Sequence, residues 1–181
     1  MIIFREANLS DIDNIMRLEG KCFNQYTQES QEVYENRIKY FPEGFIVMEI
    51  VMKKEKIFYG AVSSEIWNYR ETVLLKDFSL GHSIKEQLDL NGNELYISSI
   101  GIFPQYRSSG YGKKLFNELI VHVKTLFPKV TKGILLLNET WINAMKIYQD
   151  FGFKYVCEFP GFFTADDKSK QKAIVMRKAP L

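Results

Sequence analysis

Apolar residues recur along this 181-residue chain with two different periods, and each period predicts one kind of element. A period of two, or a short continuous apolar run, predicts a strand, whereas spacings of three and four predict an amphipathic helix. Strands are predicted at residues 2–6, 45–52, 57–67, 94–102, 133–137, 154–159 and 172–177. Helices are predicted at residues 11–22, 29–40, 115–127 and 140–151. Together they predict an α/β (α+β) fold in which a mixed, mostly antiparallel sheet carries helices on both faces.

The predicted helices begin and end at residues of the types that cap helices. Ser10 followed by Asp13 resembles a capping box at the start of the first helix. Thr140 is the expected N-cap of the last helix, and Gly152 is its expected C-terminal stop.

Three connecting segments are polar or rich in turn-forming residues. Lys53-Lys54-Glu55-Lys56 is expected to join two strands as a hairpin. Residues 70–93 form a long, polar insertion, and long loops of this kind are usually functional or mobile. Pro160-Gly161-Phe162-Phe163 is expected to be a loop between the last two strands.

The predicted strand in the middle of the chain changes its apolar phase. Leu95 and Ile97 share one phase of the two-residue period, whereas Ile100 and Ile102 share the other. A strand changes phase when one residue is inserted, and such an insertion is a β-bulge. The pattern therefore predicts a bulge near Ser98-Ser99.

A turn with two glycines, residues 105–112, follows this strand and opens directly into a predicted helix. The free amides of a helix N-terminus bind anions, and Gly110 and Gly112 let the backbone approach a phosphate closely. Arg107 adds a fixed positive charge. No GxxxxGK(S/T) loop occurs, and the glycines do not complete a dinucleotide fingerprint. The turn predicts a phosphate cradle, and the alternative is a pair of ordinary turn glycines.

The segment from Ile100 to Gly112 resembles the acetyl-CoA site of the GNAT superfamily of N-acetyltransferases. It combines an apolar-x-apolar strand end, a proline and the pattern (Q/R)xxGx(G/A). The resemblance implies a GNAT-type sheet with a β-bulge in the fourth strand, where a slot opens for the pantetheine arm of acetyl-CoA. The residues that it places at the cofactor are Ile100, Gly101, Ile102, Arg107, Ser108, Ser109, Gly110, Tyr111, Gly112, Lys113, Asn138 and Asn143.

A second segment, Ala144-x-x-x-Tyr148-x-x-x-Gly152-Phe153, is similar to the second GNAT motif. In that family the tyrosine stands near the cofactor sulfur as general acid, which implies this role for Tyr148. The alternative is that Tyr148 is a core aromatic of an amphipathic helix. The family often has an asparagine where this chain has Trp141, and Asn138 and Asn143 flank that position.

A protonated amine must lose a proton before it attacks a thioester, so a base or a water chain is required. In the amino-terminal half, Cys22-Phe23, Gln28-Glu29-Ser30 and the run from Asn36-Arg37-Ile38 to Phe45 resemble the acceptor-side helices of arylalkylamine N-acetyltransferases. In that family two histidines on the bulged strand relay this proton. The matching positions here are Tyr96 and Ser98. The candidate bases are Glu94 and Tyr96, with His82 of the insertion as a third because histidine titrates near neutral pH.

Length and composition limit the number of domains, the localisation and the kinds of binding site that are expected. The length, and the lack of a linker or repeat, predict a single domain over residues 1–181. A net charge of +2 with interspersed signs makes a nucleic-acid surface unexpected. No apolar run is long enough to span a membrane and the amino terminus lacks a signal-peptide layout, so a cytoplasmic protein is expected. Cys22 and Cys157 are expected to be free thiols, and no metal site is expected.

Three functions are compatible with these residues. The first is an acetyl-CoA-dependent N-acetyltransferase in which a small primary amine attacks directly, in a ternary complex. The second is acetylation of a peptide or protein amino group, with Pro160-Gly161-Phe162-Phe163 lining an open groove. The third is a non-catalytic acyl-CoA-binding protein. The acceptor and the choice between monomer and homodimer are not specified by the sequence.

Overall fold

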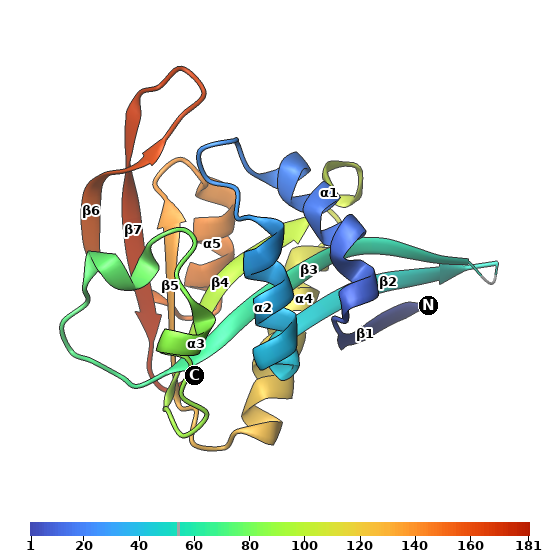
Figure 1. Ribbon diagram of the computed structural model, residues 1–181, viewed down its shortest axis with the longest axis horizontal. Coiled ribbons are helices and arrows are strands. Elements are labelled where there is room, and N and C mark those ends of the chain that lie inside the picture. Colours follow the sequence, from blue (N-terminus) through green and yellow to red (C-terminus); the bar gives the residue numbers. More distant parts are fainter. Residues whose placement is uncertain (54) are drawn as a thin grey trace.

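The computed structural model describes residues 1–53 and 55–181 (Figure 1). Its strands are β1 (Ile2–Glu6), β2 (Phe45–Met52), β3 (Glu55–Trp67), β4 (Glu94–Ile102), β5 (Lys132–Asn138), β6 (Lys154–Thr164) and β7 (Lys170–Lys178). Its helices are α1 (Ile12–Cys22), α2 (Gln31–Tyr40), α3 (Ile84–Gln87), α4 (Tyr111–Leu126) and α5 (Ile142–Asp150). Four short 3-10 helices are η1 (Leu9–Asp11), η2 (Pro42–Gly44), η3 (Leu75–Phe78) and η4 (Pro104–Tyr106). Lys54 of the predicted hairpin turn lies outside the described residues.

The seven strands form one sheet in the order β1-β2-β3-β4-β5-β7-β6. β4 and β5 run parallel, whereas each of the other neighbouring pairs runs antiparallel. α4 provides the crossover from β4 to β5 that two parallel neighbours need. The mixed, mostly antiparallel sheet that the sequence predicts is therefore confirmed.

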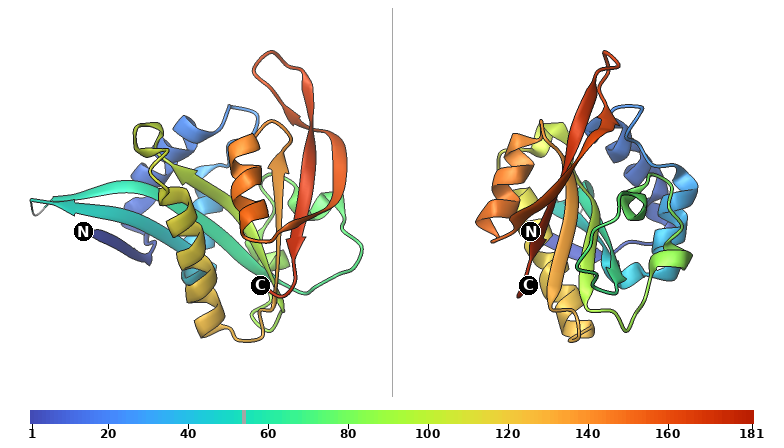
Figure 2. Two further views of the ribbon diagram at one scale, coloured as in Figure 1. Left: turned by 180° about the vertical axis from the view of Figure 1, so that it is seen from behind. Right: turned by 90° about the vertical axis from the view of Figure 1, so that its left-hand side faces the viewer.

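Helices cover both faces of this sheet. α1 and α2, with the short α3, lie on one face, and α4 and α5 lie on the other (Figures 1 and 2). α4 buries Leu115, Phe116, Leu119 and Val123 completely, and each such side chain contributes about 1.5–3 kcal/mol by leaving water. Among the described residues, no helix has both the length and the apolar character that a membrane crossing requires.

β4 contains the predicted bulge at its centre. Ile97 and Ser99 pair with two successive residues of β3, so the intervening Ser98 has no register partner there, although its hydroxyl lies 2.8 Å from that of Ser63. The parallel ladder between β4 and β5 ends at the pair of Ile97 and Leu135. Beyond this pair the remaining residues of β4 and β5 are not paired with each other, and a slot opens in the middle of the sheet.

The predicted capping box at the first helix is wrong by two residues. Asn8 and Asp11 form it instead, at the start of η1. The Asn8 side chain accepts a hydrogen bond from the amide of Ser10, and the Asp11 carboxylate accepts one from the amide of Asn8. Ser10 and Asp13 match the capping pattern in sequence, but a separate 3-10 turn precedes the longer helix and carries the box.

The predicted N-cap of the last helix is also wrong, whereas its predicted stop is confirmed. Trp141 occupies the N-cap of α5. Thr140 instead donates its hydroxyl to Asn138 Oδ1 at 3.0 Å. Gly152 follows the helix with φ of 87°, a left-handed conformation that glycine adopts without a Cβ clash.

Two predicted loops contain regular structure. The insertion at residues 70–93 includes η3 and α3. The segment Pro160–Phe163 is not a loop but lies within β6, where the register with β7 shifts between Phe159 and Phe163. β6 is at the edge of the sheet, which is where a proline without an amide donor is tolerated in a strand.

Candidate active site

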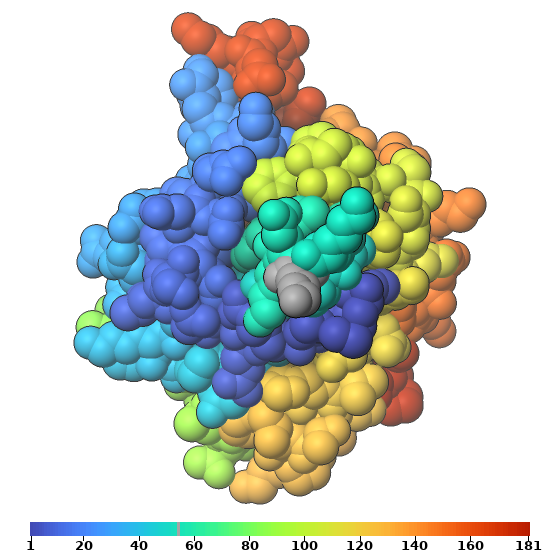
Figure 3. All heavy atoms as spheres, turned by 90° about the vertical axis from the view of Figure 1, so that its right-hand side faces the viewer, coloured from blue at the N-terminus to red at the C-terminus, as the bar shows by residue number. Residues whose placement is uncertain are grey.

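The turn between β4 and α4 leaves a series of backbone amides without partners. Ser108 and Gly110 adopt left-handed conformations, with φ of 67° and 75°. In the described part of the chain, the amides of Tyr111, Gly112 and Lys113, which open α4, have no acceptor. A Cβ at Gly110 would meet no atom within 4 Å, so the space in front of the turn is open. This segment, yellow-green in Figure 3, lies at the protein surface near the projecting β2–β3 hairpin.

A cavity of about 790 Å³ joins this turn to the slot in the sheet. This volume is in the range of protein pockets that bind small molecules and cofactors. The walls come from the end of α1, the bulged half of β4, the unpaired end of β5 and the inner face of α5. The lining includes residues 96–102 of β4, residues 135–137 of β5, and Arg107, Ser108, Gly110, Tyr111, Gly112 and Lys113 of the turn.

The slot presents backbone donors and acceptors to this cavity. The amide of Phe103 donates to the carbonyl of Tyr59 in β3 at 3.0 Å. Successive amides of an antiparallel strand point to opposite sides, so the amides of Ile102 and Ile100 point away from β3. The Ile102 carbonyl points the same way and accepts a hydrogen bond from Arg107 Nε at 2.9 Å. An extended ligand with amide groups can therefore bond to the main chain here.

Tyr148 of α5 brings a proton donor to the slot. Its side chain is buried, with ring centroids 5.3 Å from Phe116 and 6.3 Å from Phe153, and it lines the cavity. Its hydroxyl bonds to none of the described residues. Burial raises the pKa of Tyr148 well above its usual value, so the hydroxyl keeps its proton at neutral pH.

The model of the acetyltransferase (GNAT) family matches residues 12–153. The chain belongs to this family. The match includes the turn, the slot and Tyr148, so it confirms the resemblance that the glycine turn and the tyrosine motif indicate in the sequence.

Individual relatives of this GNAT chain are distant. A spermine/spermidine N(1)-acetyltransferase from Bacillus subtilis (strain 168) is 31% identical over 67 residues, which cover 37% of this chain. The chain spans 43% of the length of that relative. The fold matches the loading GNATL domain of CurA from Lyngbya majuscula with a TM-score of 0.78, at 14% identity over 99% of this chain and 98% of the other. It matches Arabidopsis thaliana NAA60 in complex with acetyl-CoA with a TM-score of 0.74, at 20% identity and the same coverage.

The turn and the slot of the GNAT chain fit acetyl-CoA. The free amides at the start of α4 suit a pyrophosphate, and the open space at Gly110 leaves room for it. The amides that face the slot suit the two amide groups of a pantetheine arm. Arg107 and Lys113 line the cavity beside the turn, although Lys113 Nζ also bonds to Asp150 at 2.6 Å.

The two asparagines that flank Trp141 lie differently. Asn143 lines the cavity. Asn138 does not line it, because its amide group is bonded within the protein: Nδ2 donates to Gln171 Oε1 at 2.7 Å, and Oδ1 accepts from Thr140. Asn138 therefore stabilises the turn after β5, and Asn143 is the one that can contact a ligand.

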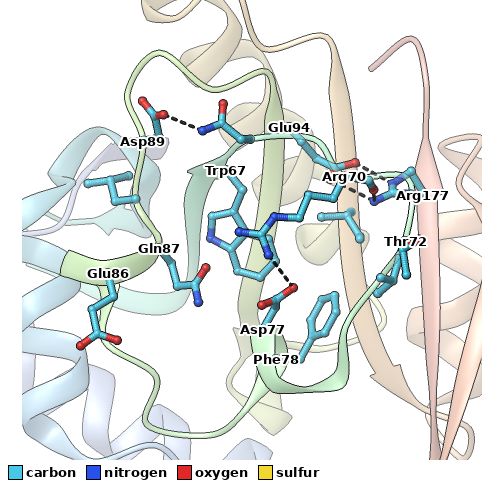
Figure 4. Close-up of a pocket in the computed structure, with 14 residues that line it drawn as sticks. Trp67, Arg70, Thr72, Asp77, Phe78, Glu86, Gln87, Asp89, Glu94 and Arg177 are labelled. Carbon is cyan, nitrogen blue, oxygen red and sulfur yellow. Dashed lines mark hydrogen bonds and ion pairs between the residues drawn. The ribbon is translucent and has the colours of Figure 1, made fainter.

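Glu94, a base candidate from the sequence, does not reach the main cavity. It lines a second cavity of about 280 Å³ between the start of β4 and the insertion (Figure 4). Its carboxylate is buried and bonded to Arg177, with Glu94 Oε1 2.6 Å from Arg177 Nε. Sequence position alone places it on the right strand, but the start of that strand lies on the other side of Phe78.

Tyr96 and His82 are also unsuited to accept a proton from the acceptor. Tyr96 lines the cavity, but its ring is stacked on Trp67 at 4.1 Å and burial raises its pKa far above neutrality. Its hydroxyl therefore stays protonated. His82 does not line the cavity, and both of its ring nitrogens already have partners, Ser79 O and Glu65 Oε1.

The cavity also contains a carboxylate that is not among the base candidates predicted from the sequence. Glu19 of α1 is buried, lines the cavity, and accepts hydrogen bonds from the Tyr34 hydroxyl at 2.6 Å and the Glu29 amide at 2.8 Å. Tyr34 also reaches Ser99 Oγ of the bulge at 3.4 Å. Burial raises the pKa of Glu19, and the hydrogen bonds only partly offset it. A sequence signal existed, because Glu19 lies four residues after Ile15 and three before Cys22, which puts it on the apolar face of α1.

Both cysteines are free thiols. Cys22 lines the cavity with its Sγ 3.2 Å from Arg107 Nη2, and burial raises its pKa, so it remains a thiol at neutral pH. Within residues 1–53 and 55–181, no group of three or more metal-ligating side chains is close enough to hold a metal ion.

Proposed function

We propose that this protein transfers an acetyl group from acetyl-CoA to a primary amine that attacks directly within a ternary complex. The observation that carries the proposal is the continuous cavity from the open amides of the turn, through the slot at the bulge, to the hydroxyl of Tyr148. A phosphate cradle at one end and a proton donor at the other suit a long thioester that is cleaved at its far end.

The residues that would hold acetyl-CoA are mostly backbone groups. The amides of the turn and of the first residues of α4 would bind the pyrophosphate, with Arg107 adding charge. The amides of Ile100 and Ile102 would bond to the pantetheine arm, and either could stabilise the developing oxyanion. When bound, acetyl-CoA supplies the thioester carbonyl that is attacked and the thiolate that leaves.

Two side chains of the cavity suit the proton transfers. Tyr148 holds its proton at neutral pH and would donate it to the departing sulfur. Glu19 would accept the proton of the amine, directly or through Ser99 and water, because burial moves its pKa toward neutrality. In this assignment Glu19 replaces Glu94, which does not line the main cavity, and Tyr96, which lines it but keeps its proton because burial raises its pKa.

The acceptor end of the cavity suits a small cationic amine. The carboxylates of Glu19 and Glu29 both line it, so a protonated amine would be attracted there. The rim is aromatic: the Trp141 ring lies 5.5 Å from Phe23 and 5.3 Å from Phe163. Aromatic faces stabilise nearby cations and also bind apolar parts of an amine. The short match to a polyamine acetyltransferase supports including polyamines among the acceptors to be tested.

The rim also supports a small acceptor over a long peptide. Asn24, just after α1, donates its side-chain amide to the carbonyl of Thr164 in β6 at 2.9 Å. Together with the contacts of Trp141, this bond links the two sides of the rim. Asn24 and Thr164 do not line the cavity themselves, but they adjoin Phe23 and Phe163, which do. The link therefore closes part of the space that a peptide continuing past its acetylated residue would use.

Thiol release from acetyl-CoA across a panel of amines tests the proposal. The panel holds arylalkylamines, polyamines, amino acids and short peptides, each at several pH values, with mass spectrometry of the product. Acetylation of free amines supports the proposal, whereas acetylation of peptides alone would favour the peptide alternative. If calorimetry shows tight binding of coenzyme A but no acceptor is acetylated, a non-catalytic acyl-CoA-binding protein is the remaining alternative. Absence of coenzyme A binding would overturn all three.

A further inference from the structure

One wall of the main cavity comes from the insertion between β3 and β4. Phe78 and Leu80 line this cavity, and Phe78 also lines the second cavity shown in Figure 4. The Phe78 ring is packed against Trp67 and Tyr96, with centroids 5.6 and 5.3 Å away. Leu80, by contrast, is 47% exposed. Its position in the wall therefore depends on what anchors the residues next to it.

Two hydrogen bonds anchor the residues that follow Leu80. His82 Nε2 lies 2.8 Å from Glu65 Oε1, and the amide of Gly81 donates to Glu29 Oε2 at 2.8 Å. The Glu65 side chain is fully buried and that of His82 is 7% exposed. Glu29 itself lines the cavity, so the second bond ties the wall to a residue at the acceptor end.

The contacts of the His82 ring require the cationic form. Nδ1 lies 3.0 Å from the carbonyl oxygen of Ser79, and Nε2 faces the Glu65 carboxylate. Both partners are acceptors only, so each ring nitrogen must carry a hydrogen for both bonds to form. A neutral imidazole has one N–H and must lose one of the two bonds.

Of the charged groups around His82, Glu65 favours this cation and Arg37 opposes it. Glu65 of β3 contacts it directly, and the ring of Tyr96 in β4 lies 6.0 Å away. From α2 and the residues before it, Arg37 Nε is 3.6 Å from Glu65 Oε1, and Arg37 also pairs with Glu29. Burial alone would lower the pKa of His82, but the hydrogen bond and the charge of Glu65 outweigh burial and Arg37 and raise it.

We propose that the imidazolium of His82 is a latch that holds Leu80 in the acceptor wall, so that acceptor binding weakens when His82 loses its proton. The inference rests on the proposed function, because it names a residue that positions the acceptor end of the same cavity. His82 is a positioning residue, since it does not line the cavity. The latch is complete below the ordinary histidine pKa of about 6.5 and is released as pH rises through the raised pKa of the folded protein.

The test compares His82→Gln with the wild type across pH, with an acceptor found in the amine panel. At each pH the acceptor KM of the variant is divided by that of the wild type, which cancels the ionisation of the acceptor itself. Loss of a hydrogen bond between charged groups predicts a ratio of about tenfold near neutral pH. The ratio should fall to about one at alkaline pH, where the wild type has also lost the latch. The KM for acetyl-CoA should not change.

The chain supplies a matched control in its other histidine. His122 of α4 also faces a carboxylate, Glu6 Oε1 at 3.0 Å, but it does not line or support the cavity. His122→Gln should give a KM ratio of about one at every pH. Leu80→Ala should raise the acceptor KM at every pH, because it removes the wall side chain and not the titrating group.

A second measurement does not depend on turnover. Nitrogen-15 NMR of the histidine rings should show both nitrogens of His82 protonated at neutral pH, and proteolysis within residues 70–93 should accelerate as His82 deprotonates. A neutral His82 ring at neutral pH, or a KM ratio that is constant across pH, would overturn the latch. If no amine is acetylated, the proposed function fails, and the NMR titration and proteolysis still decide whether the latch exists.

Discussion

Substitution of Tyr148 by phenylalanine tests whether this residue is a general acid or only a core aromatic. The change removes one hydroxyl and keeps the ring that packs between Phe116 and Phe153. Because that hydroxyl bonds to none of the described residues, its loss leaves no unpaired group behind. The free energy of unfolding should therefore change by less than about 1 kcal/mol.

The expected effect on turnover is much larger. One general acid contributes about 10²- to 10⁴-fold to the rate, which corresponds to about 2.7–5.4 kcal/mol in activation free energy. The buried hydroxyl of Tyr148 holds its proton because its pKa is raised, so the variant lacks a donor at every pH below that value. We expect kcat to fall by at least about 10²-fold while the KM for acetyl-CoA stays close to that of the wild type.

Thiol release gives the kinetic constants, and thermal melting of the same preparations gives the stability. Coenzyme A binding by calorimetry confirms that the variant still has an intact cradle. A kcat equal to that of the wild type would show that Tyr148 is only a core aromatic. A large fall in melting temperature would show that its hydroxyl supports the fold, which would also refute the reasoning.

Three further substitutions test other parts of the site. Glu19→Gln should lower kcat/KM by about 10²-fold or more and flatten the acid limb of the pH profile. In the wild type this limb arises because the carboxylate becomes protonated, and can no longer accept a proton, as pH falls through its raised pKa. An unaltered profile rules out the base role. Gly110→Ala puts a methyl group into the open space before the turn, at a strain of about 1–2 kcal/mol. Calorimetry should show weaker coenzyme A binding than for Gly152→Ala, which has the same backbone strain outside the cavity, and equal affinities count against the cradle. Glu94→Gln should lower the free energy of unfolding by about 3 kcal/mol, since it leaves Arg177 without its buried partner. It should leave kcat near that of the wild type. Thermal melts measure the loss of stability, and the thiol assay shows whether kcat is kept.

The fold could be predicted from sequence because its main elements have strong local patterns. The apolar stripe of α4 and the phase change between Ile97 and Ile100 each have one simple structural solution, and both predictions are confirmed. The errors lie where the backbone departs from regular periods. The 3-10 turn at Leu9–Asp11 carries the capping box two residues earlier than predicted. Pro160 and Gly161 are typical of a loop, but β6 accommodates them by a shift of its register with β7.

The candidate site also has one part that the sequence predicts and one part that it does not. The proposed coenzyme side consists of backbone amides, and backbone geometry leaves a trace in the glycines of the turn. The proposed acceptor side consists of side chains from α1, from the residues before α2 and from the insertion, which are brought together only by tertiary packing. Such packing leaves no local pattern in the sequence, so Glu94 is a base candidate from its place on β4, whereas the structure places it in the second cavity and places Glu19 in the main one.

The slot in the sheet also affects how readily the purified protein aggregates. Past the bulge, β4 and β5 each present a free edge toward the other, and unpaired edges are places where foreign chains can add themselves as extra strands. A molecule that occupies the slot shields both edges and, at a hundredfold excess over its Kd, adds about 2.7 kcal/mol to the stability of the native form. Protein purified without coenzyme should accordingly be the more prone to precipitate on storage, and adding coenzyme A should restore its shelf life.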